Sequence, residues 1–302
     1  MDKKTMIEEI KRLKKEKNAV LLAHFYQEGD IQDVADFCGD SLYLSQVAAE
    51  TDADVIVFAG VHFMAETAKI LSPDKKVLLP VEEAGCPMAD MVTDIRLENY
   101  KKKNPDRKVV CYVNSTAKVK ALSDICVTSS NAEKIIEHYR DEKLLYIPDK
   151  NLGSYLREKY NLDMEVWPGF CCVHNDITLD HVEAARRAYP NAELIVHPEA
   201  KLEVLHKADY IGSTSGLLKY TIDSDTQEFI VGTEDGIIHQ MEKHNPTKKF
   251  HVLKQNLKCY DMKLTRLEDV YLALRDDQFE VDVPKEIREK AFVALDKMLK
   301  LS

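Results

Sequence analysis

The sequence predicts an α/β fold made of three similar α/β/α sandwich domains related by pseudo-threefold symmetry. Two observations lead to this prediction. The cysteines Cys86, Cys171 and Cys259 follow one another at intervals of 85 and 88 residues, and apolar segments recur with nearly the same spacing. A long internal repeat defines an architecture before any local motif does. Three equivalent domains are therefore expected, with the three cysteines meeting on a common central axis.

The opening strand of each copy carries the clearest repeated signal. These strands are expected at residues 19–24, 109–112 and 194–197, and each ends in a polar residue: His24, Tyr112 and His197. A hydroxyl residue follows 17 positions later in every copy: Ser41, Ser129 and Thr214. A single interval of this kind could arise by chance, but three identical intervals indicate equivalent positions in three copies.

The remaining elements recur in the same order. Helices are predicted near residues 6–13, 93–103 and 179–189, ahead of the opening strands. Second strands are predicted at 55–58, 144–147 and 229–231, and third strands near 77–79, 165–167 and 251–253. These strands are short continuous apolar runs, which are typical of parallel sheets covered by helices on both faces.

The copies define the expected domain boundaries. The three repeats are predicted to span residues 1–90, 91–175 and 176–262, each containing one of the three spaced cysteines, and a tail follows at 263–302. Two helices are predicted in the tail, at 266–274 and 284–301, and both are expected to pack on the first domain. No low-complexity linker separates the copies, so one rigid body is expected.

Composition indicates a cytoplasmic enzyme rather than a nucleic-acid or membrane protein. The 302 residues carry a formal net charge of −10, which argues against broad contact with nucleic acid or anionic lipid. No apolar run approaches the roughly 18 residues needed to span a bilayer, and residues 1–17 lack the apolar core of a secretory signal. Neither a Gly-x-Gly-x-x-Gly fingerprint nor a P-loop occurs, which disfavours a nucleotide-binding fold. Seven cysteines in a reducing compartment suit metal binding or catalysis.

Ligands of parallel sheets bind beyond the carboxyl ends of the strands, where helix N-termini point outward. The repeated polar residues fall at this end of each predicted sheet. A Ser or Thr at a helix start suits a carboxylate or phosphate group, although plain N-capping is the alternative role for Ser41, Ser129 and Thr214.

The three spaced cysteines predict a metal centre. Thiolates bind zinc or iron–sulfur clusters, and a four-iron cluster held by only three cysteines leaves one iron open as a Lewis acid. Zinc with three cysteines and a water is the competing prediction. Cys38, Cys111 and Cys126 are interpreted as buried apolar residues. Spacing alone does not decide between Cys171 and its neighbour Cys172.

Several strings in the sequence resemble the quinolinate synthase family, and together they span nearly the whole chain. They are Leu22-Ala23-His24-Phe25-Tyr26-Gln27, Gly39-Asp40-Ser41-Leu42, Phe63-Met64-Ala65-Glu66, Gly85-Cys86-Pro87-Met88, Tyr112-Val113-Asn114-Ser115-Thr116, Val196-His197-Pro198-Glu199, Gly212-Ser213-Thr214 and Gly232-Thr233-Glu234. The resemblance implies a [4Fe-4S] cluster at the centre of three α/β/α domains. It also selects Cys171 as the second ligand, because the family's ligand precedes a Val-His pair by two places.

The resemblance further implies a reaction. Iminoaspartate condenses with dihydroxyacetone phosphate to give quinolinate, with release of phosphate and two waters, in NAD biosynthesis, and an L-aspartate oxidase or dehydrogenase is the implied functional partner. The expected catalytic residues are Glu199, Tyr26 and His197, and His174 is a candidate support for the cluster. Substrate-binding roles are predicted for His24, Ser41, Tyr112, Val113, Asn114, Ser129, His197, Pro198, Glu199, Ser213 and Thr214. The rival hypotheses are a three-cysteine zinc lyase or hydrolase and a non-enzymatic iron–sulfur sensor.

Overall fold

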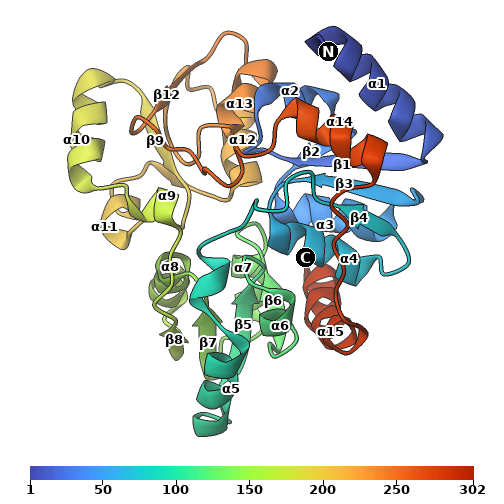
Figure 1. Ribbon diagram of the computed structural model, residues 1–302. Coiled ribbons are helices and arrows are strands. Elements are labelled where there is room, and N and C mark those ends of the chain that lie inside the picture. The colour runs from blue at the N-terminus through green and yellow to red at the C-terminus, as the bar shows by residue number, and fades with distance from the viewer.

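The computed structural model describes all 302 residues and contains three parallel four-stranded sheets with one shared strand order. The first sheet has the order β2-β1-β3-β4, the second β6-β5-β7-β8 and the third β10-β9-β11-β12. In Figure 1 the three sheets occupy three lobes, the first at the upper right, the second at the bottom and the third at the upper left. The α/β class with three similar sheets, predicted from the repeat, is thereby confirmed.

The strand bounds follow the chain in three sets of four. They are β1 (Ala19–His24), β2 (Phe37–Gly39), β3 (Val55–Ala59) and β4 (Lys76–Leu78); β5 (Lys108–Tyr112), β6 (Ile125–Val127), β7 (Leu144–Ile147) and β8 (Met164–Val166); β9 (Glu193–Val196), β10 (Tyr210–Ile211), β11 (Glu228–Gly232) and β12 (Lys249–Val252). All nine strands expected from the sequence are present. The edge strands β2, β6 and β10 were not predicted, because two or three residues are too few to form a periodic apolar signal.

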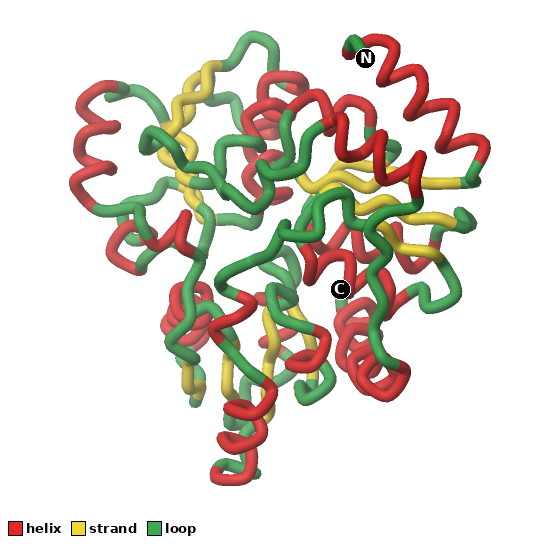
Figure 2. Tube along the Cα trace, viewed as in Figure 1, coloured by secondary structure: helices red, strands yellow, loops and turns green.

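Helices surround the strands throughout the molecule (Figure 2). In the first lobe they are α1 (Lys3–Glu16), α2 (Gly29–Val34), α3 (Ser41–Glu50) and α4 (His62–Leu71); in the second α5 (Asp94–Lys103), α6 (Ala117–Lys120), α7 (Ala132–Glu137) and α8 (Lys150–Tyr160), preceded by the 3₁₀ turn η1 (Ala89–Met91). The third lobe has α9 (Cys172–Asn175), α10 (Leu179–Ala188), α11 (Leu202–Leu205), α12 (Thr214–Asp223) and α13 (Ile237–His244). The tail forms α14 (Leu267–Asp276) and α15 (Lys285–Leu301).

Both faces of the first sheet are buried, as the continuous apolar runs predicted. Along β1, Val20 and Leu22 belong to one apolar cluster while Leu21 and Ala23 belong to another. Successive strand residues point to opposite faces, so the two clusters lie on the two sides of the sheet. The larger cluster continues into the second and third sheets, and the three lobes therefore share one core.

A second repeated feature is an aspartate near the amino end of each sheet that accepts a backbone N–H group of the opening strand. The carboxylates of Asp36, Asp124 and Asp209 accept the backbone N–H groups of Leu21, Val109 and Leu194 at 2.8, 2.7 and 2.7 Å. Each aspartate stands just before an edge strand and lies 15 residues after its donor. The three aspartates are spaced by 88 and 85 residues, so the sequence already contained this signal.

The tail helices pack on two different lobes. Helix α14 lies against α1 and β3, as expected for the first domain, but α15 packs mainly on α6 and β6 of the second lobe and also reaches α4. The expectation that both helices cover the first domain was therefore wrong for α15. Its apolar stripe, Ala291, Ala294, Leu295 and Met298, is fully buried at this position, where the first and second lobes both contribute to the contact.

Candidate active site

A pocket of about 670 Å³ lies where the carboxyl ends of the three sheets converge. Its wall contains Cys86, Cys171 and Cys259, one cysteine from each predicted repeat. Ten further residues expected from the sequence also line it: His24, Tyr26, Ser41, Tyr112, Asn114, Ser129, His174, His197, Glu199 and Thr214. The fold thus brings together residues that lie up to 235 positions apart.

Three of the predicted substrate-binding residues lie outside the lining. The Ser213 hydroxyl accepts the Gly216 N–H at 3.1 Å and caps α12, so it is engaged by the backbone. Val113 is buried and its N–H pairs with the Val127 carbonyl, while Pro198 is buried between two lining residues. The lining also includes residues to which the sequence analysis assigned no role, notably Asp40, Thr128 and Glu234 and the apolar Val61, Phe63, Met64, Met88, Val173 and Met262.

The pocket hydroxyls are not helix caps. Ser41 and Thr214 are the first residues of α3 and α12, but the caps are the preceding Asp40, whose carboxylate accepts the Tyr43 N–H, and Ser213. Ser129 lies two residues before the N-cap of α7 and its hydroxyl is 3.3 Å from His197 Nε2. The capping alternative is therefore wrong for all three, and their side chains are available to the pocket.

The three pocket cysteines have similar electrostatic surroundings. Burial raises the pKa of each thiol, for Cys259 to about 12, while the backbone N–H of the third residue on (Ala89, His174 and Met262, respectively) acts in the opposite direction and favours the thiolate. None of the three is in a disulfide. Partly buried free thiols that converge on one pocket fit the demands of an iron–sulfur cluster, which takes cysteine thiolates as its ligands.

The other four cysteines lie outside the pocket lining. Cys172 is exposed and does not line the pocket. Cys111 and Cys126 are fully buried, in register on β5 and β6, and Cys38 lies on β2 with its thiol 3.6 Å from Gln32 Oε1. These positions are those of strand residues in the core or at its edge.

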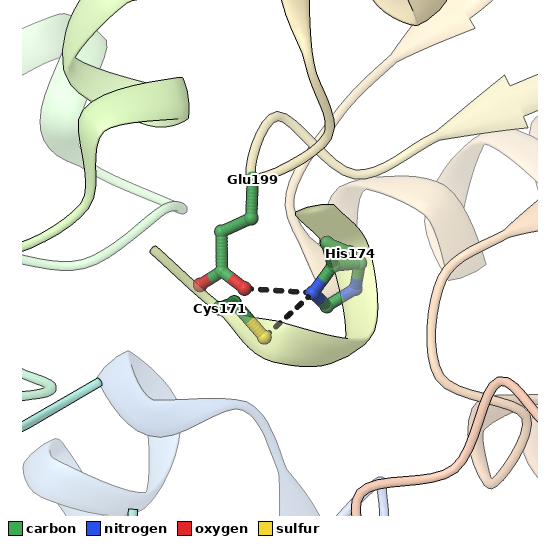
Figure 3. A group of neighbouring side chains, drawn as sticks. All are labelled: Cys171, His174 and Glu199. Carbon is green, nitrogen blue, oxygen red and sulfur yellow. Dashed lines mark hydrogen bonds and ion pairs between the residues drawn. The ribbon is translucent and has the colours of Figure 1, made fainter. Parts of the chain in front are cut away.

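Glu199 lies between two polar side chains of the pocket wall, Tyr112 and His174. Its Oε1 accepts the Tyr112 hydroxyl at 2.6 Å, and its Oε2 lies 2.8 Å from His174 Nδ1 (Figure 3). The same His174 nitrogen is 3.2 Å from Cys171 Sγ. Because an ionised carboxylate can only accept, His174 carries a proton on Nδ1. The ligand atoms of Cys171, His174 and Glu199 all lie within 4.8 Å of one another, so this group could also hold a single metal ion.

Thr233 extends this network to the first lobe. Its hydroxyl lies 2.9 Å from His174 Nε2 and 2.8 Å from the Tyr26 hydroxyl, and Tyr26 in turn lies 3.0 Å from Thr214 Oγ1. With Nδ1 protonated, a neutral His174 accepts the Thr233 hydroxyl at Nε2. A continuous chain of hydrogen bonds therefore runs from Tyr26 through Thr233 and His174 to Glu199. Thr233 belongs to one of the family strings in the sequence, but its role was not predicted, because its partners lie 59 and 207 residues away.

Burial determines the charge state of the pocket. It lowers the pKa of His24 to about 4 and that of His197 to about 3, so both imidazoles are neutral at pH 7. Burial likewise raises the pKa of the Tyr26 and Tyr112 phenols well above 10, which keeps them protonated as donors. Burial opposes ionisation of Glu199, but the positive charge that His197 acquires in acid and the hydrogen bonds from His174 and Tyr112 outweigh it and lower the pKa of Glu199. The lining contains no lysine or arginine.

Comparison with known proteins identifies the family. A sequence profile described as quinolinate synthetase A protein matches residues 8–300. The chain belongs to the quinolinate synthase family. A quinolinate synthase from Alkaliphilus metalliredigens is 50% identical over 302 residues, and one from Clostridium kluyveri is 50% identical over 303 residues, with all of both chains covered in each case. Quinolinate synthase 2 from Methanosarcina acetivorans is 49% identical over 302 residues, which is all of this chain and 97% of that protein.

Membership of the quinolinate synthase family confirms the resemblance that the sequence motifs indicated. The motifs surround the pocket, since His24, Ser41, Met64, Cys86, Tyr112, His197, Thr214 and Glu234 all line it. None of the helices combines the length and apolar character needed to cross a bilayer.

Proposed function

We propose that this chain is a quinolinate synthase that condenses iminoaspartate with dihydroxyacetone phosphate to form quinolinate, phosphate and two waters. The observation that carries the proposal is the pocket itself. Three thiols from three repeats line it together with a buried carboxylate, Glu199, hydrogen-bonded to Tyr112 and His174. Relatives that bear the name quinolinate synthase match the chain from end to end.

In this proposal Cys86, Cys171 and Cys259 hold a [4Fe-4S] cluster on the axis of the three domains, whose boundaries we place near residues 90, 175 and 262. When bound, the cluster supplies an open iron that acts as a Lewis acid toward a substrate hydroxyl or carboxylate. Cys172 is not a ligand, because it is exposed and outside the lining. His174 supports the ligand set through its contact with Cys171.

Glu199 is the proposed acid–base residue. Its lowered pKa keeps it ionised at pH 7, the form that can accept a proton from substrate, and the Tyr112 and His174 hydrogen bonds fix its position. Tyr26 is too weak an acid to act as a base at pH 7 but donates hydrogen bonds. The hydrogen bond from Thr233 to Nε2 orients the His174 ring so that its Nδ1–H group points toward Glu199, and Thr233 is itself held by Tyr26.

The substrates carry two carboxylates and a phosphate, and neutral donors must bind them here. Ser41 and Thr214 stand at the first turns of α3 and α12, where free backbone N–H groups and the helix dipole favour anions. Ser129, Asn114 and the neutral His24 and His197 add further donors and acceptors. The lack of lysine and arginine in the lining makes these groups the main protein ligands of the anions.

The proposed substrate also indicates a functional partner. Iminoaspartate is an imine formed by two-electron oxidation of the aspartate amine, so an L-aspartate oxidase or dehydrogenase is the expected source. The proposed binding partners of this chain are small molecules in the cytoplasm, and no nucleic acid or membrane is among them.

The test is anaerobic reconstitution with iron and sulfide, followed by metal analysis and measurement of quinolinate by mass spectrometry. Four irons and four sulfides per chain with quinolinate formation support the proposal. A full cluster without quinolinate would favour an iron–sulfur sensor instead.

One observation favours a second candidate, a zinc lyase or hydrolase. Cys171, His174 and Glu199 offer sulfur, nitrogen and oxygen ligands within 4.8 Å of one another, a mixed donor set that zinc accepts. Stoichiometric zinc and no visible absorbance after reconstitution with both metals would establish this candidate and exclude the cluster.

A further inference from the structure

Two buried carboxylates outside the catalytic network occupy equivalent places in the fold. Asp149 is the second residue after β7, and Glu234 is the second residue after β11. The strands end in the same register, since Ile147 pairs with Cys111 of β5 and Gly232 pairs with Val196 of β9. Both side chains are fully buried.

Each carboxylate accepts two backbone N–H groups, one from each of two segments. Asp149 Oδ1 accepts the Leu152 N–H at 2.7 Å in the first turn of α8, and its Oδ2 accepts the Cys171 N–H at 3.1 Å. Glu234 Oε2 accepts the Gly236 N–H at 2.7 Å before α13, and its Oε1 accepts the Cys259 N–H at 3.2 Å. The two cysteine amides lie 22 and 25 residues beyond the carboxylates that bind them.

We propose that Asp149 and Glu234 are positioning residues that fix the main chain of Cys171 and Cys259 and thereby hold these thiols in place for the metal centre. This inference rests on the proposed ligand set. A helix cap needs only one carboxylate oxygen. The second oxygen connects the cysteine main chain to the end of a strand that is paired on both sides in its sheet.

The Cys259 side has an additional contact. Lys263 Nζ lies 3.2 Å from Glu234 Oε1, so the carboxylate holds both Cys259 and the side chain four residues later. A buried carboxylate that is paired and doubly hydrogen-bonded loses little freedom, which suits a positioning role.

The first repeat has no carboxylate at the equivalent position. Its equivalent residue, the second after β3, is Val61, which has no side-chain acceptor. Here the loop before Cys86 is held by main-chain hydrogen bonds instead of a carboxylate. The His62 N–H donates to the Ala84 carbonyl at 2.8 Å, and the Ala84 N–H donates to the Val81 carbonyl at 3.2 Å. The three ligands are therefore held unequally, two by carboxylates and one by its own loop.

The decisive variants separate capping from positioning. Asp149→Ser keeps an oxygen that can cap α8 but removes the second acceptor, and Asp149→Asn and Glu234→Gln place an amide N–H against one of the two backbone donors. Asp124→Asn is the matched control, because Asp124 also accepts a strand N–H, that of Val109, at 2.7 Å, but at the opposite end of the same sheet.

Two measurements are made on each protein. The first is the rate at which the anaerobically reconstituted protein loses iron to a chelator, which we expect to rise at least tenfold in the Asp149 and Glu234 variants and to stay within twofold in Asp124→Asn. The second is amide hydrogen exchange of the segments around Cys171 and Cys259 in the metal-free protein, which should accelerate at least tenfold in the corresponding variant alone.

The outcomes separate this inference from the proposed function. If wild-type protein binds no cluster, the proposed function fails while hydrogen exchange still tests the positioning contacts. Iron loss and exchange in Asp149→Ser that match the Asp124→Asn control would overturn the inference even with an intact wild-type cluster. Melting temperatures of the metal-free variants identify any that fail to fold, and the other carboxylate then supplies the test.

Discussion

The Tyr112 hydroxyl donates a 2.6 Å hydrogen bond to Glu199 Oε1 across 87 residues of sequence and between two lobes of the molecule. Both side chains are buried, and Glu199 is held from its other side by His174. A fixed, ionised carboxylate in a pocket with three thiols is the feature on which the mechanistic predictions depend.

Replacing Glu199 by Gln should stop proton transfer but leave the pocket intact. The amide keeps the shape and can still accept the Tyr112 hydroxyl, so iron content and quinolinate binding should persist. Turnover should fall by roughly 100-fold or more, the scale of a lost acid–base group. Steady-state kinetics and binding of quinolinate by calorimetry check this, and turnover near wild type with full iron would remove Glu199 from the chemistry.

The cluster ligands should separate cleanly from the other cysteines. Cys86→Ser, Cys171→Ser and Cys259→Ser should each lower the amount of bound iron and abolish activity. Cys38→Ala, Cys111→Ala and Cys126→Ala should retain the bound iron and the activity. Iron and sulfide analysis of each reconstituted variant is the measurement. The exposed Cys172 is the matched control for Cys171, and iron loss in Cys172→Ser with retention in Cys171→Ser would reverse the ligand assignment.

The pocket hydroxyls should affect substrate use more than stability. Because Ser41, Ser129 and Thr214 are not caps, their replacement by Ala should raise KM for dihydroxyacetone phosphate or iminoaspartate by at least tenfold with little change in unfolding free energy. Ser213→Ala is the control, since loss of that cap should cost about 1 kcal/mol of stability with a small kinetic effect. The opposite pattern, a lower Tm with unchanged KM in Ser41→Ala, contradicts an anion-binding role.

Thr233→Val tests the link between Tyr26 and His174. Valine has nearly the same shape but removes the hydroxyl from two buried partners, and we expect a stability loss of roughly 1–3 kcal/mol with kcat reduced at least tenfold. The control is Thr221→Val, because Thr221 is also buried but its hydroxyl donates to the Leu218 carbonyl away from the pocket. Equal kcat values in the two variants would show that the link through Thr233 does not serve turnover.

The buried histidines should make the metal-free protein acid-sensitive. The pKa of His24 is lowered to about 4 and that of His197 to about 3, so below pH 6.5 the unfolded chain binds protons that the folded chain does not. Their contribution is therefore complete above pH 6.5 and is lost as the pH falls toward 3, by about 2 kcal/mol per histidine at pH 5. Urea unfolding between pH 7 and 5 measures it, and His197→Asn should show a shallower pH dependence than wild type.

The sequence by itself determined the repeated architecture and the place of the site. The 85- and 88-residue spacing of Cys86, Cys171 and Cys259 predicted three equivalent units, and the nine main strands appear where the apolar runs placed them. It also predicted that polar residues at the strand ends would share a pocket, because parallel strands bring their carboxyl ends to one edge. Local patterns and long-range periodicity suffice for such conclusions.

Only the tertiary structure decided which side chains meet. Ser213 and Thr214 are adjacent in sequence, yet one caps a helix and the other contacts Tyr26 across the pocket, because successive residues in a helix start point in different directions. Thr233, Asp149 and Glu234 gain their roles from partners 22 to 207 residues away. The position of α15 likewise depended on which lobes offered an apolar surface. The contact of Tyr26 with Thr233 and the position of α15 arise from packing between lobes, whereas the contacts of Asp149 and Glu234 join distant segments of one lobe. No pattern within one segment of the chain encodes either kind of contact.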